Sequence, residues 1–241
     1  GILIPPSVML VIYGFLTEQS VGKLFVAGVL PGLLGILFYL LAVVFVVSRN
    51  PALGPAGERS NWRERLMALR DVWTTLGLFI FVIGGIYAGM FTPTEASGMG
   101  AAGAMLIAWR RGALKHGALM QVLRETTITT AKLFFILFGA LIFSNFVNRA
   151  GLPDGLIGIV NAFDLSPLGV IFIILLIYVL LGCVFESLSM ILLTVPIFAP
   201  VVANLGFDLI WFGILVVVVT EISLITPPIG LNVFVLKGVL K

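Results

Sequence analysis

The residues best suited to bind an ion lie near the end of the chain, in the stretch Ser223–Gly230, whose sequence is SLITPPIG. Its two consecutive prolines remove two backbone donors and disfavour helical angles in the residue before each, so a helix must break here. In hydrocarbon, carbonyls left without partners are tolerated only where they are buried in protein or line a cavity. A cation satisfies several such carbonyls at once. We expect it to face the Thr226 hydroxyl and the carbonyls of Ser223, Thr226 and Pro228, and oxygen-only ligands of this kind suit Na⁺ better than a transition metal.

A second proline pair, Pro5-Pro6, stands at the start of the chain. The two breaks offer positions at the same spacing: Gly1, Ile4 and Pro6 at the first, and Ser223, Thr226 and Pro228 at the second. Ile4 contributes only its backbone, so a first ion site would rest on carbonyls. The alternative is that both proline pairs merely kink helices. Broken helices in corresponding halves of a membrane protein are the sequence sign of a transport site, which favours the ion-binding interpretation.

Two carboxylates lie inside apolar runs and are therefore functional candidates. Glu186 lies in the joint between two such runs, close to Gly182, Ser187 and Ser189, and Glu221 comes just before the second break. An isolated carboxylate at membrane depth is costly unless it is paired, protonated or hydrated. The alternative role for Glu186 is the N-cap of the following helix, and Glu221 has the alternative of a hydrogen bond within the scaffold.

The composition predicts an integral membrane protein that is all-α. Of 241 residues, 60% are hydrophobic and only 10% are charged, against about 25% charged in soluble domains. The formal net charge is +3, and the Lys and Arg residues lie in short loops, which gives nucleic-acid binding no support. One cysteine, Cys183, and one histidine, His116, exclude an intrachain disulfide and a Cys/His metal cluster. The chain shows no signal peptide, and we expect it to be a fragment of a longer protein.

Apolar runs and their polar connections predict the helices. In order they are a short helix from Ser7 to about Leu16, a span over Val21–Val47, an interfacial amphipathic helix over Asn61–Val72, a span over Val72–Phe91, a helix from Thr92 to Trp109, a span over Thr127–Val147 and an in-plane helix over Gly151–Phe163. The loops at 49–71 and 110–124 are rich in arginine, which places them on the cytoplasmic side. Thr92 with Glu95 is a capping box with Pro93 at the first helical position, although Glu95 has the alternative of facing a cavity.

The last third of the chain predicts a hairpin and a broken helix. The runs Leu168–Leu181 and Met190–Val202 are short for spans, and no basic residue separates them. We interpret them as a re-entrant hairpin, while a pair of full spans would give the same sidedness. The run Leu209–Ser223 then breaks and resumes over Leu231–Lys241, so the two proline-paired helices cross the membrane in opposite directions. That is the sign of an inverted-topology repeat.

Four motifs in order then resemble a known family. They are Gly1–Ser7 (GILIPPS), Phe91–Ala96 (FTPTEA), Leu192–Ile197 (LLTVPI) and Ile225–Asn232 (ITPPIGLN). Together they resemble the large membrane subunit of tripartite ATP-independent periplasmic (TRAP) transporters, over essentially the whole chain. The resemblance implies an inverted-repeat, elevator-type fold of the ion-transporter superfamily. It also implies a multi-pass protein of the bacterial inner membrane that imports small carboxylates with sodium.

The resemblance further implies partners and a site. The partners are a small four-helix membrane subunit, a periplasmic substrate-binding protein, an organic-acid substrate and the lipid bilayer, and no cofactor is expected beyond the coupling ion Na⁺. The sodium sites fall on the six break residues given above. The substrate and hairpin-tip group comprises Gly182, Glu186, Ser187, Ser189, Ser7 and Asn232. One departure is Glu186, where the family usually has Asp, so its longer side chain need not orient the loop in the same way.

These expectations divide the chain into four parts: residues 1–16, the second half of the first broken helix; 17–149, scaffold; 150–166, an in-plane arm; and 167–241, the hairpin and second broken helix. Two alternative functions remain. One is a related ion-coupled carboxylate carrier or antiporter that works without a binding protein. The other, an intramembrane enzyme, is disfavoured because the sequence has no His-Glu-x-x-His, no Gly-x-Ser-x-Gly and no histidine in any span.

Overall fold

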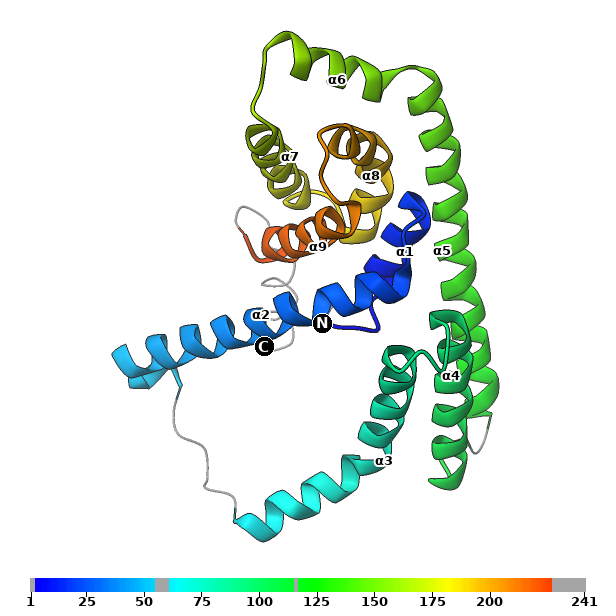
Figure 1. The fold of residues 1–241 in the computed structure, drawn as a ribbon. Coiled ribbons are helices and arrows are strands. Elements are labelled where there is room, and N and C mark those ends of the chain that lie inside the picture. Colours follow the sequence, from blue (N-terminus) through cyan, green and yellow to red (C-terminus); the bar gives the residue numbers. More distant parts are fainter. Residues whose placement is uncertain (1–2, 55–60, 115–116, 227–241) are drawn as a thin grey trace. The chain divides into compact units, whose positions relative to one another are not determined.

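A computed structural model describes residues 3–54, 61–114 and 117–226 (Figure 1). In these ranges every regular element is helical, which confirms the all-α prediction. The elements are α1 (Val8–Thr17), α2 (Val21–Arg49), the 3₁₀ turn η1 (Pro51–Leu53), α3 (Trp62–Tyr87), α4 (Pro93–Arg110), α5 (Ala118–Arg149), α6 (Leu152–Ala162), α7 (Pro167–Gly182), α8 (Ser187–Asn204) and α9 (Leu209–Ile225).

The chain divides into two compact units, residues 1–31 with 127–241 and residues 32–126. One boundary falls at Pro31, inside α2. A proline in a helix interior removes one backbone hydrogen bond, so α2 is weakest where the division falls. The four-part division expected from the sequence is a finer one and stays a prediction.

The first unit is built around α8. Helices α1, α6, α7 and α9 all contact α8, and α1 and α7 also contact α9. In Figure 1, α6 connects the end of α5 to the start of α7. Three large aromatic side chains, Tyr13, Tyr178 and Phe212, are fully buried in this unit. The Thr194 hydroxyl lies 2.7 Å from both the Tyr178 hydroxyl and the Met190 carbonyl, so it can accept from the first and donate to the second. This pairing satisfies the buried phenol between α7 and α8.

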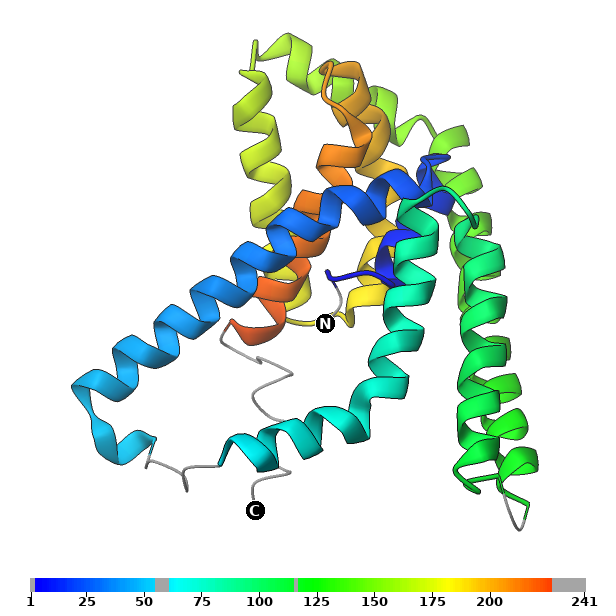
Figure 2. The ribbon, with the colours of Figure 1, turned by 60° about the horizontal axis from the view of Figure 1, so that its bottom comes forward.

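The second unit contains the pair α3 and α4. Helix α3 bends by 54° between its segments Trp62–Leu69 and Val72–Tyr87, as Figure 2 shows. The bend lies where the sequence predicts the change from an interfacial helix to a span. At the start of α4, Glu95 Oε2 accepts from the Thr92 N–H at 2.8 Å, and Thr92 Oγ1 accepts from the Glu95 N–H at 3.3 Å. The predicted capping box is therefore confirmed, and Glu95 has this capping role in the structure.

Three helices of the described part are long and apolar enough to cross a membrane, namely α2, α5 and α8, with a fourth if both segments of α3 count as one. Helix α5 begins at Ala118 rather than at the predicted Thr127. The early start has a local cause, because residues 118–126 contain neither Gly nor Pro, and Gln121 Nε2 donates to Glu125 Oε1 at 2.8 Å one turn on. Because α8 has spanning length, the choice between a re-entrant hairpin and two spans stays open.

Candidate ion-binding site at the hairpin tip and the second helix break

The second helix break lies where the prolines predict it. Helix α9 ends at Ile225, and Thr226 adopts an extended conformation with φ −87° and ψ 133°. The Thr226 N–H donates to the Ser223 carbonyl at 3.2 Å, which closes the last turn. Pro227 and Pro228 stand where a continuing helix would supply N–H donors to the carbonyls of Ser223 and Leu224, and neither has one. The end of α9 therefore presents carbonyl oxygens with spare lone pairs.

Three hydroxyls follow one face of α9 toward this break. Thr220, Ser223 and Thr226 are spaced three residues apart, which places them near one another on the helix surface. Each donates to a carbonyl of the preceding turn at 2.7 Å: Thr220 to Val216, Ser223 to Thr220, and Thr226 to Ile222. Because the proton points at the backbone, the Thr226 oxygen keeps its lone pairs for a cation. Thr220 was not predicted as part of the site, although its three-residue spacing from Ser223 is visible in the sequence.

The tip of the hairpin touches this break directly. Gly182 is the last residue of α7 and is buried, and Ser223 is fully buried opposite it. A Cβ built at Gly182 would overlap the Cβ and Oγ of Ser223 and would lie 3.6 Å from Met190 Sδ. Only glycine allows the two backbones to approach this closely. The structure thus brings together two predicted site residues that are far apart in the sequence.

The other tip residues are engaged in capping α8. Glu186 is its N-cap: Oε2 accepts from the Ser189 N–H at 3.2 Å and from the Ser189 hydroxyl at 3.3 Å. Its carboxylate is exposed, whereas Ser187 is buried. The capping alternative for Glu186 is therefore what the structure shows, and a direct contact with substrate stays a prediction. This cap satisfies the Ser189 amide in the first turn of α8.

At the first break, residues Leu3–Pro6 form a bend that leads into α1. Ser7 caps α1 as predicted, its buried Oγ accepting from the Leu10 N–H at 3.3 Å. The Leu3 carbonyl lies 3.1 Å from the position of a Cβ built at Gly28, so the bend passes closely over α2. Ile4 and Pro6 connect to the second break through α1, which contacts α8 and α9.

Three predicted site residues lie outside the described residues: Gly1, Pro228 and Asn232. The predicted continuation of the second broken helix over 231–241 lies there too.

Tyr13 joins α1 to α9 and was not foreseen. Its hydroxyl donates to the Leu209 carbonyl at 2.6 Å, and its ring meets that of Phe212 edge to face at 6.5 Å. A Cβ built at Gly213 would lie 2.7 Å from Tyr13 Cδ1, so the ring fills the space that this glycine leaves. A single amino-acid sequence does not indicate that an aromatic residue and a glycine this far apart pack against each other.

Glu221 carries an unsatisfied oxygen. Its Oε1 is the buried side-chain oxygen that finds no hydrogen-bond partner among the described residues. A buried acceptor without a partner costs about 1–3 kcal/mol, and more if it is charged. The scaffold hydrogen bond considered for Glu221 is therefore not formed within the described part. A proton, a water or a cation would satisfy this oxygen.

The fold and this site define a helical, multi-pass membrane protein in which a helical hairpin packs on a helix broken by paired prolines. The sequence matches the family described as "Tripartite ATP-independent periplasmic transporter, DctM component" over residues 1–241. The chain belongs to this family, as the four motifs predict.

Named relatives agree with this membership. The chain is 39% identical over 241 residues to the C4-dicarboxylate TRAP transporter large permease protein of Pseudomonas aeruginosa, covering 99% of this chain and 56% of the relative. It is 33% identical over 244 residues to the sialic acid TRAP transporter large permease protein of Vibrio cholerae, again covering 99% and 56%. It is also 33% identical over 244 residues, with the same coverage, to the ectoine/5-hydroxyectoine large permease protein of Ruegeria pomeroyi. The chain thus spans little more than half the length of these relatives.

Proposed function

We propose that this chain forms the ion-binding and substrate-binding part of a TRAP large permease, a subunit of a secondary importer that uses a sodium gradient to take up a small organic acid. Family membership supports the transporter class. The relatives are named for C4-dicarboxylates, sialic acid and ectoine, all of which carry a carboxylate. The protein then catalyses no covalent chemistry and needs no cofactor beyond Na⁺.

The contact between Gly182 and Ser223 carries this proposal. It places the tip of the hairpin against the carbonyl-rich end of α9, where Ser223, Thr226 and Pro228 are the proposed sodium ligands. A sodium ion there would tie tip and break together by offsetting the repulsion between their carbonyl dipoles. The carboxylate of Glu221, two residues before Ser223, offers negative charge to balance the ion. A second sodium ion would use the carbonyls of Gly1, Ile4 and Pro6 at the first break.

Sodium binding would then organise the substrate site. We place the organic acid at the hairpin tip, near the N-terminus of α8, where the first-turn amides other than the Ser189 N–H, which Glu186 caps, would face the anion. Ser187 and Ser189 lie at that N-terminus, and Ser7 and Asn232 complete the proposed group. Coupling would follow because a bound ion favours the state in which the tip lies against α9. This also explains how a site without an obvious basic residue can accept a carboxylate.

The wider setting is also part of the proposal. The permease would lie in the bacterial inner membrane, receive substrate from a periplasmic binding protein, and be braced by a small four-helix membrane subunit. The hairpin and the broken helices would move as an elevator, related by an inverted repeat. The opposite directions expected for the two proline-paired helices support this view.

Substrate uptake by the full-length permease in liposomes tests the proposal. Uptake is measured with and without an inward sodium gradient, each with and without the cognate binding protein, and with an equal potassium gradient as the ionic-strength control. Uptake that needs both sodium and the binding protein is the expected result. Sodium-driven uptake without the binding protein would instead identify a stand-alone carrier. Uptake that is indifferent to sodium would refute the cation sites at both breaks.

A further inference from the structure

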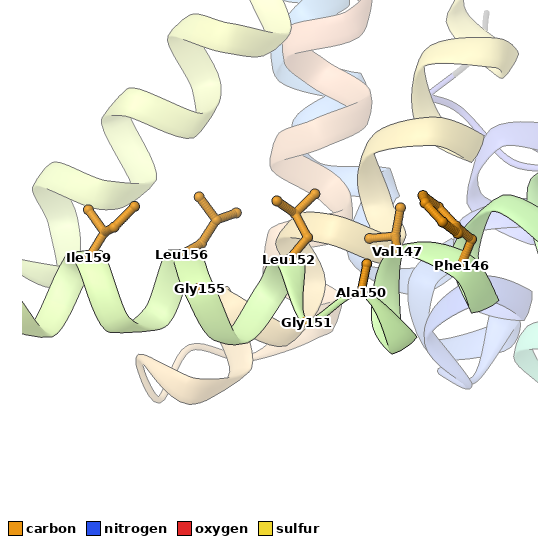
Figure 3. A pocket seen from close by; sticks show the side chains of 8 residues that line it. All are labelled: Phe146, Val147, Ala150, Gly151, Leu152, Gly155, Leu156 and Ile159. Atoms are coloured by element: carbon orange, nitrogen blue, oxygen red, sulfur yellow. The ribbon is translucent and has the colours of Figure 1, made fainter.

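An apolar groove lies at the elbow between α5 and α6 (Figure 3). Its volume is about 430 Å³, within the range of small-molecule sites. It is lined by Phe146, Val147, Ala150, Gly151, Leu152, Gly155, Leu156 and Ile159. Figure 3 shows the five large side chains of this set projecting to the same side of the two helices. The groove therefore has one continuous apolar wall.

Small residues keep the floor of the groove open. Gly151 adopts a left-handed conformation with φ 71°, which turns the chain from α5 into α6. A Cβ built at Gly151 or at Gly155 would meet nothing within 4 Å. Val147 is buried and Leu156 is half-buried, but Leu152 and Ile159 remain 44% and 52% exposed, so the described part of the protein leaves the α6 end of this wall largely uncovered.

A positively charged side chain, Arg149, follows the end of the groove that α5 forms. Arg149 is the last residue of α5 and follows the lining residue Phe146 by three positions, so the two are neighbours on the helix surface. Arg149 is exposed. The adjacent N-terminus of α6 has no side-chain cap, which leaves the positive end of its dipole uncompensated by a capping group. Asp154, in the first turn of α6, is the one acidic side chain nearby in sequence.

We propose that this groove binds an acyl chain of a membrane phospholipid whose phosphate is held by Arg149. Helix α5 is long and apolar enough to cross a membrane and ends at Arg149, so Arg149 lies where a span ends, at the level of the head groups. The apolar wall begins directly beside it and runs along α6. A phospholipid has its groups in the matching order: an anionic phosphate at the interface and a hydrocarbon tail next to it.

The chemistry of the elbow also selects the head group. An acyl chain gains little hydrophobic free energy on leaving other lipid tails, so selectivity must come from packing and from the phosphate contact. An arginine–phosphate contact is a charge-assisted hydrogen bond, the strong class of such bonds. Asp154, in the first turn of α6, attracts a cationic group close by. Phosphatidylethanolamine carries an ammonium group beside its phosphate, whereas phosphatidylglycerol has the phosphate alone, so the zwitterionic phosphatidylethanolamine is preferred. This inference uses residues 146–159 alone and is independent of sodium coupling.

Photo-cross-linking in proteoliposomes tests the groove. The full-length permease is reconstituted with phosphatidylethanolamine that carries a diazirine on one acyl chain, and the labelled peptides are mapped by mass spectrometry. Label concentrated on residues 146–159 is the expected result. Gly155→Leu fills the groove and should lower this label about tenfold. Gly158→Leu is the matched control, because Gly158 lies on the same helix, also has nothing within 4 Å of a built Cβ, and does not line the groove. Its label should equal that of the unmodified protein.

Two further arms distinguish the parts of the proposal. Arg149→Gln should lower the label about tenfold, the loss of one charge-assisted contact, and the phosphatidylglycerol analogue should label the groove less than phosphatidylethanolamine does. Equal label in the Gly155→Leu and Gly158→Leu variants would overturn the groove as the site. A photoreactive amino acid placed at Leu152 that cross-links to protein rather than lipid would overturn lipid as the occupant. Equal thermal unfolding of the two glycine variants ensures that a loss of label reflects the groove.

Discussion

Replacement of Gly182 by alanine is the most direct test of the proposed ion site. The added Cβ would overlap both side-chain heavy atoms of Ser223, which is fully buried and has no room to move aside. Carbon atoms need about 3.5–4 Å, so the end of α7 and the end of α9 must separate by roughly 1 Å or more. Overpacking of this kind costs about 1–3 kcal/mol. A shift of this size at the ligands should raise the sodium concentration for half-maximal uptake about ten- to a hundredfold.

The assay is sodium-dependent uptake in liposomes together with thermal unfolding of the purified protein. Gly139→Ala is the matched control, because a Cβ there meets nothing within 4 Å. The double variant Gly182→Ala/Ser223→Gly restores space while keeping the Ser223 carbonyl, the proposed ligand. It should therefore recover most of the lost sodium affinity, and the double-mutant cycle gives the coupling between tip and break. If Gly182→Ala behaves like Gly139→Ala in both measurements, the tip does not meet the break and the site is wrong.

Three further changes have definite expectations. Thr226→Ala should weaken the sodium dependence of uptake more than it lowers thermal stability, because its hydroxyl stands at the break; Thr226→Ser, which keeps the hydroxyl, should restore sodium dependence, and normal dependence in the alanine variant would count against this ligand. Tyr13→Phe removes the 2.6 Å bond to the Leu209 carbonyl and should destabilise the protein by about 1 kcal/mol in chemical denaturation; an unchanged midpoint would mean that the bond contributes nothing. Glu221→Gln removes a carboxylate with an unsatisfied buried oxygen, so thermal stability should stay unchanged or rise. Sodium-driven uptake should become slower. A loss of stability without a loss of uptake would assign Glu221 to the scaffold.

Local signals in the sequence predicted the helices and their ends well. The prolines at 227–228 fixed the end of α9, Ser7 fixed the start of α1, and the Thr92–Glu95 box fixed the start of α4. In each case the signal acts on the backbone within one or two turns, where sequence alone suffices. The predicted start of α5 at Thr127 was wrong because a polar helical segment, here residues 118–126, resembles a loop when only hydropathy is considered.

Contacts between distant segments were beyond the sequence. The approach of Gly182 to Ser223 and the packing of Tyr13 over Gly213 depend on how α1, α7 and α9 pack. At many other glycines of the described residues, an added Cβ would meet nothing within 4 Å. For Glu186, the sequence left both a capping and a substrate role open, and the hydrogen bonds from Ser189 decide for capping. The unsatisfied oxygen of Glu221 likewise becomes visible only once its surroundings are known.

The lengths of α2 and α5 have a consequence for bilayer thickness. Helix α5 has 32 residues and is about 48 Å long, but the span predicted within it, residues 127–147, covers about 31 Å, close to the hydrocarbon thickness of about 30 Å. Helix α2 has 29 residues and is apolar over nearly all of its roughly 43 Å, so it must tilt to fit the same membrane. In a thicker bilayer α2 can stand more upright, whereas α5 would draw polar residues into hydrocarbon. The tolerance of this permease for thick membranes is therefore set by α5.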